Sequence, residues 1–107
     1  MKHDACLGVY LAELSFPEAR TLKDKRAPLA SLRDVLQSRF RASISEVGLQ
    51  DAWQRARVLV VVAASSLQQT RERLDDIDRY LHAQAFEVAR VLLKTADTVD
   101  TVWEFDS

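Results

Sequence analysis

The chain has 107 residues, of which 48% are apolar and 29% are charged, and its formal net charge is -1. These values predict one compact domain with a hydrophobic core, and they exclude a strongly basic protein that binds nucleic acid through its overall charge. The single cysteine, Cys6, excludes an intramolecular disulfide and a cysteine-based metal cluster, and it fits a reducing cytoplasm.

The first predicted element is a strand over residues 5–15, where side chains alternate between two faces. Leu7, Val9 and Leu11 form one set, and Tyr10 belongs to the other. A lysine followed by an apolar run also begins a signal peptide, but acidic residues interrupt this run and no small-residue cleavage site follows it. We therefore expect a strand, and no run approaches the roughly 20 apolar residues that a membrane helix needs.

An amphipathic helix is predicted from Thr21 to about Phe40, because leucines recur at helical spacing. Thr21 and Asp24 have the spacing of a helix cap, but Pro28 lacks the N–H that a helical hydrogen bond needs. We expect an irregular or kinked first turn.

Two further strands are predicted over residues 42–47 and 58–64, with a polar loop between them that holds Trp53. Ser66 and Gln69 have the spacing of a cap for a second helix. A fourth strand is expected over residues 86–93. Residues 1–95 then form one domain, and residues 96–107 form a polar tail that is loose or adds an edge strand through Trp103 and Phe105.

The element order β-α-β-β-α-β predicts an α+β, ferredoxin-like fold, in which a four-stranded antiparallel sheet carries two helices on one face. The third strand is apolar on both sides, whereas a sheet with one wet face should alternate apolar and polar residues. We therefore expect a second copy of the chain to cover the open side of the sheet. The predicted interface residues are Tyr10, Trp53, Leu59 and Val61.

A basic cluster lies in the first turn of the predicted helix, where the helix dipole disfavours cations. It consists of Lys23, Lys25 and Arg26. A helix start with free N–H groups and cations suits a phosphate, so we expect an anion or RNA site here, extended by Arg55 and Arg57. The alternative is that these side chains point into solvent or pair with neighbouring carboxylates.

The polar loop contains no nucleophile, no tuned acid–base pair and no glycine-rich phosphate loop, so we expect a protein that is not an enzyme. Trp53 either stacks on an RNA base or packs across the hairpin or into a homodimer, with Glu46 and Asp51 pairing with Arg55 or capping the turn. For Trp53, packing across the hairpin or into a homodimer is favoured over stacking on RNA. The two histidines lack partners at ligand spacing, so neither a metal site nor a cofactor is expected.

Four segments together resemble the bacterial YlxP-like family, a domain of unknown function. They are LKDKR at 22–26, SISEVG at 43–48, QD at 50–51 and WQRA at 53–56, the last leading into VLVVVA. The resemblance spans about residues 5–95 and implies a ferredoxin-like fold. It also implies a link to translation or RNA metabolism, because members are typically encoded beside transcription-elongation, translation-initiation and ribosome-maturation factors. It implies no catalytic residues, and Pro28 and the tail after Thr95 depart from the usual pattern.

Two functional hypotheses follow from these observations. In the first, the protein associates with RNA or the ribosome through its basic helix start. In the second, it is a homo-oligomeric protein-interaction module that binds no nucleic acid.

Overall fold

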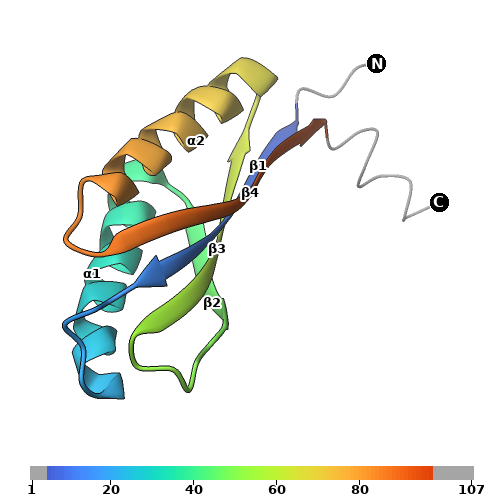
Figure 1. Cartoon of the computed structure of the whole chain (residues 1–107). Helices are drawn as coiled ribbons and strands as arrows, with labels where there is room; N and C mark the ends of the chain where they lie inside the picture. Colours follow the sequence, from blue (N-terminus) through green and yellow to red (C-terminus); the bar gives the residue numbers. More distant parts are fainter. Residues whose placement is uncertain (1–4, 98–107) are drawn as a thin grey trace.

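The computed structural model describes residues 5–97. Its elements are, in chain order, β1 (Cys6–Ser15), α1 (Leu22–Phe40), β2 (Ser43–Gly48), β3 (Arg55–Ala64), α2 (Leu67–His82) and β4 (Glu87–Asp97). The strands form one antiparallel sheet in the order β2-β3-β1-β4. Both helices lie on the same face of this sheet (Figure 1). The predicted ferredoxin-like fold is confirmed.

The element boundaries differ from the predicted ones mainly at the strands. β3 begins at Arg55, three residues before the predicted start, and β4 continues to Asp97 instead of ending near Leu93. The helix α1 starts at Leu22 and continues through Pro28. An irregular or kinked first turn was expected because of this proline. The aromatic pair proposed for an extra edge strand, Trp103 and Phe105, lies outside the described residues.

Both predicted helix caps are confirmed. The Thr21 hydroxyl accepts a hydrogen bond from the backbone N–H of Asp24 at 3.2 Å, and the Ser66 hydroxyl accepts one from that of Gln69 at 3.1 Å. Each bond satisfies an N–H that has no partner within its helix. The helix starts are therefore set by local sequence.

The core lies between the two helices and the face of the sheet that they cover. It contains alternate residues of β1 and β3 together with one stripe from each helix: Tyr10, Ala12, Leu14, Ala56, Val58, Val60, Val62, Leu32, Leu36, Leu74, Ile77 and Leu81. Each of these side chains is at most 2% exposed. The even-numbered residues of β3 therefore face the helices.

Tyr10 belongs to this core, which differs from its expected place in an interface. It pairs with Val60 across the strands, and directly paired side chains project from the same face of a sheet. Its ring is fully buried, and its hydroxyl donates a hydrogen bond to the carboxylate of Asp78 on α2. Burial, and then this hydrogen bond, raise the pKa of the Tyr10 hydroxyl.

Candidate functional site

The face of the sheet opposite the helices is apolar at its centre. Leu11 of β1 pairs with Leu59 on β3 and with Leu92 on β4, and the next pair along, Val9 and Val61, continues the strip. We call this strip the open face and define it as Leu7, Val9, Leu11, Leu59, Val61 and Leu92. Neither helix covers it (Figure 1). The expectation that Leu59 and Val61 lie on the uncovered side is confirmed, whereas their role in an interface stays a prediction.

A β-bulge in β4 extends the open face to the edge of the sheet. Leu11 pairs with Leu92 but Ala12 pairs with Arg90, so Val91 is the extra residue. The bulge lets Arg90 point toward the helices, where its guanidinium lies 3.9 Å from the Asp78 carboxylate. Val91 and Leu92 are 53% and 42% exposed, which leaves apolar surface at this edge.

A charged group ends the open face on β1 and β3. The Glu13 carboxylate accepts hydrogen bonds from Arg55 at 2.7 Å and from Arg57 at 2.5 Å. The bonds from Arg57 and Arg55 hold the pKa of Glu13 below its ordinary value. Both guanidinium groups are paired within the chain while staying about half exposed. The expectation that these two arginines contact RNA stays a prediction.

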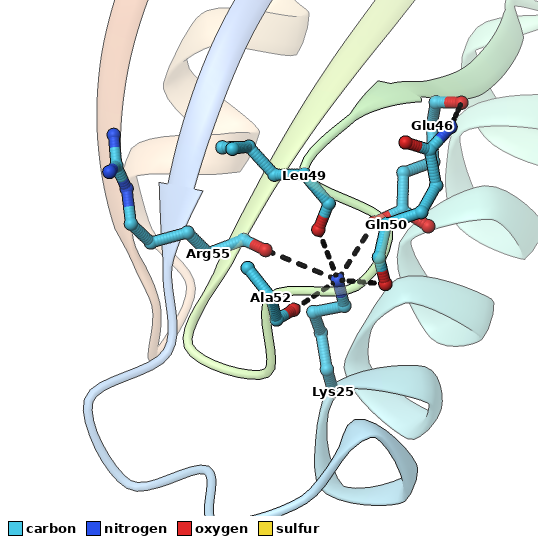
Figure 2. A network of polar contacts seen from close by, with 6 residues as sticks. All are labelled: Lys25, Glu46, Leu49, Gln50, Ala52 and Arg55. Carbon is cyan, nitrogen blue, oxygen red and sulfur yellow. Dashed lines mark hydrogen bonds and ion pairs between the residues drawn. The ribbon is translucent and has the colours of Figure 1, made fainter.

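Lys25 occupies an unusual position for a lysine, because its side chain is only 3% exposed. It leaves the first turns of α1 and enters the loop between β2 and β3 (Figure 2). There the ammonium lies 2.9 Å from the Glu46 carboxylate and 2.6 Å from the carbonyl oxygen of Ala52. Three further carbonyl oxygens, those of Leu49, Gln50 and Arg55, lie 3.1 to 3.4 Å away.

The Lys25 ammonium therefore organises the loop. Loop carbonyls that converge on one point repel one another unless a cation sits among them, and Leu49 adopts a left-handed backbone conformation with φ of 62° to turn its carbonyl inward. Lys25 was expected to bind an external anion, but its ammonium is sequestered by five oxygen atoms of the protein. Glu46 was expected to pair with Arg55, and it pairs with Lys25.

Of the predicted basic cluster, Lys23 and Arg26 remain exposed on α1. The sequence contains a signal that Lys25 is buried while its basic neighbours are exposed. Lys25 lies four residues before Leu29, seven before Leu32 and eleven before Leu36. These separations place it on the apolar stripe of the helix.

Trp53 lies in the loop that Lys25 organises, and it is 52% exposed. The loop is held against the β1–α1 connection, since the backbone N–H of Phe16 donates to the Gln54 carbonyl at 2.8 Å and the Gln54 side chain donates to the Ala19 carbonyl at 3.1 Å. Trp53 lines a shallow hollow with Pro17 and Arg20. Its expected contact with a partner stays a prediction.

Residues 5–97 contain no group of three or more metal-ligating side chains of the histidine, cysteine, aspartate and glutamate types. Within the same residues, no helix is long and apolar enough to cross a membrane. The arrangement offers two kinds of chemistry: an oxygen cage that holds an ammonium, and an apolar sheet face bordered by a paired carboxylate.

Comparisons with known proteins agree with this fold and with the signature segments. The family described as protein of unknown function, DUF503, matches residues 7–94. The chain belongs to this family. The uncharacterized protein YlxP of Bacillus subtilis (strain 168) is 33% identical over 89 residues, which cover 83% of this chain and 96% of that protein. The YlxP-like resemblance is thereby confirmed, and neither description assigns an activity to DUF503.

Proposed function

We propose that this DUF503 protein is a non-enzymatic, cytoplasmic protein-interaction module that self-associates through the open face. The observation that carries the proposal is the strip of leucine and valine side chains centred on Leu11, which no element of the described chain covers. Monomeric proteins rarely leave a continuous apolar patch of more than a few hundred Å² in water. A partner surface of the same character removes that cost.

The size of the sheet supports a second copy as this partner. Ten-residue strands span about 33 Å and four strands span about 19 Å, so each copy offers roughly 600 Å² of flat face before side-chain relief is counted. A stable interface needs about 800 Å² of accessible surface from each partner. The area of the open face together with its margins is of the same order as this requirement.

The charges on the sheet also favour stacking. Glu13 already pairs with Arg55 and Arg57, so a second copy covers this end of the strip without isolating the Glu13 carboxylate. The six residues of the open face are all apolar, with Lys94 beside Val9 at its margin on β4, and a self-complementary apolar patch suits a two-fold symmetric dimer.

A pair of matched substitutions tests this proposal. Leu11→Glu places a carboxylate at the centre of the open face, whereas Leu22→Glu places the same group on an exposed leucine at the start of α1. We expect light scattering at micromolar concentration to give a dimer mass for the native chain and for Leu22→Glu, and a monomer mass for Leu11→Glu. A native chain that stays monomeric contradicts the proposal.

RNA or ribosome association is the second candidate function. Its support is the exposure of Lys23 and Arg26 at the start of α1, together with the half-exposed Arg55 and Arg57 beside Glu13. Lys25 is left out of this surface because its ammonium is buried.

The second candidate predicts RNA affinity that falls steeply with salt. The double variant Lys23→Ala/Arg26→Ala keeps Lys25 and therefore keeps the loop. It should lower the affinity, and it should reduce the salt slope by about 0.9 for each phosphate of a duplex that the variant no longer neutralises. Affinity that is independent of salt, or unchanged in the variant, contradicts this candidate.

A further inference from the structure

A hollow lies at the end of the fold where three segments meet, away from the open face. The β1–α1 connection, the first turns of α1 and the α2–β4 turn line a cavity of about 230 Å³. Its apolar lining is Phe16, Pro17, Ala19, Pro28, Ala85 and Phe86. None of these residues belongs to the open face or to the Lys25 loop, so neither proposed function uses the hollow.

The floor of the hollow contains two aromatic rings. Phe16 and Phe86 have ring centroids 5.4 Å apart and are tilted by 57°. A second, smaller hollow between α1 and α2 shares Pro28, Ala85 and Phe86 with the first. A cavity below the roughly 300 Å³ at which drug-sized sites begin suits a single ring or a branched aliphatic group.

The polar side chains around the hollow are acceptors. Glu18 and Asp24 are the polar residues of the lining, and both are carboxylates. Glu18 has no hydrogen bond or ion pair within residues 5–97. Among the described residues, no lysine, arginine or histidine lines the hollow.

An apolar floor with acceptors at its margin selects a ligand by charge and by hydrogen bonding. A carboxylate ligand meets two negative charges, and a neutral hydrocarbon leaves the acceptors without a donor. A protonated amine attached to an apolar group donates to the carboxylates at the margin while its apolar part lies against the two phenylalanine rings.

We propose that this hollow binds an apolar group of about one ring that carries a protonated amine, such as an arylalkylammonium ion. The apolar group occupies the space between Phe16, Pro28 and Phe86. The ammonium lies at the margin, where it donates to Glu18. The carboxylate of Asp24 takes part less, because it already accepts a hydrogen bond from the backbone N–H of Arg20 at 2.9 Å.

A titration series followed by amide NMR shifts tests the charge preference. The probes are phenethylammonium, phenylethanol and phenylpropionate, which share a ring and differ in charge. We expect shifts at Phe16, Ala19 and Phe86, with affinity for the cation about two- to fivefold above that for the alcohol and weakest binding of the carboxylate. Equal affinities for the three probes, or shifts elsewhere in the chain, overturn the proposal.

Two variants locate the binding. Glu18→Gln removes one exposed charge and should lower affinity for phenethylammonium about two- to fivefold while leaving that for phenylethanol unchanged. Glu72→Gln on the outer surface of α2 is the matched control. Ala85→Leu fills the hollow and should abolish binding of every probe. Unchanged binding of phenethylammonium to Glu18→Gln refutes the proposed contact, whether or not Ala85→Leu folds.

A further titration distinguishes a free amine from a segment of a partner protein. A blocked phenylalanyl-lysine amide presents the same ring and cation on a peptide backbone. Tighter binding of the peptide at the hollow identifies a peptide ligand, and tighter binding of phenethylammonium identifies a small molecule. Binding of neither overturns the proposal.

Discussion

Lys25 determines the shape of the β2–β3 loop because its ammonium lies within hydrogen-bond distance of the Glu46 carboxylate and of four converging loop carbonyls. Lys25→Met keeps the length of the side chain and removes the charge, so a buried acceptor cluster loses its cation. We expect a loss of about 3 kcal/mol in the free energy of unfolding. Urea denaturation measures this loss.

The control for this prediction is two residues away. Lys23→Met makes the same chemical change on an exposed side chain and should alter the free energy of unfolding by less than about 0.5 kcal/mol. In a Trp103→Phe background, fluorescence reports Trp53 alone, and its emission should change in Lys25→Met and not in Lys23→Met. Equal stabilities of the two variants argue against the oxygen cage.

Glu13 predicts a specific dependence of stability on pH. Its folded-state pKa is lower than the ordinary 4.5, because Arg57 and Arg55 stabilise the carboxylate. The unfolded chain therefore takes up a proton first as pH falls. The stabilisation is complete above the ordinary pKa and is lost as pH falls through the folded-state pKa.

Thermal unfolding from neutral to acidic pH measures the effect. Glu13→Gln should flatten the decline in melting temperature below the ordinary carboxyl pKa, whereas Glu72→Gln, which removes a carboxylate in no described ion pair, should retain it. Parallel curves for Glu13→Gln and the native chain contradict the assignment.

Two residues show what could be predicted from sequence at this scale. Lys25 was grouped with its charged neighbours in LKDKR, although its helical phase already placed it on the buried stripe. Tyr10 was assigned to an interface because both faces of β1 are apolar, and only the pairing of Tyr10 with Val60 decides which face is covered. Helical phase is available in the sequence, whereas strand pairing depends on the tertiary fold.

At the scale of elements, α2 packs closely on β1 because position 8 lacks a side chain. A Cβ at Gly8 would lie 2.6 Å from a Thr70 methyl and 2.7 Å from a Leu74 methyl, both on α2. Gly8→Ala should therefore push α2 from the sheet and lower the free energy of unfolding by about 1–3 kcal/mol.

Gly48→Ala is the matched control for this prediction. A Cβ there meets Arg57 side-chain atoms at 3.5 and 3.6 Å, which are ordinary contacts. Chemical denaturation should give Gly48→Ala a free energy of unfolding close to that of the native chain. If Gly8→Ala proves as stable as Gly48→Ala, the close approach of α2 to β1 is not needed.

The order and type of the elements could be predicted because local signals agree with the fold. Thr21 and Ser66 cap their helices, and the β-branched run of β3 lies at the centre of the sheet. The bulge at Val91 and the early start of β3 at Arg55 could not be predicted from the sequence, because both depend on pairing with β1. These two features place Arg55, Arg57 and Leu92 on the open side.

At the scale of the whole molecule, the sheet has one face under two helices and one apolar face that the described chain leaves uncovered. An apolar strip at the centre of a sheet face costs free energy in water unless a partner covers it. We expect this partner to be a second copy of the chain, stacked through the open face.

Isotope-filtered NOE spectroscopy on a mixture of labelled and unlabelled chains tests this claim most directly, because it detects contacts between copies only. Stacking through the open face predicts intermolecular NOEs among methyl groups of Leu11, Leu59 and Leu92, and their loss in Leu11→Glu. The absence of intermolecular NOEs at concentrations suited to NMR, or NOEs confined to the helices, would contradict it.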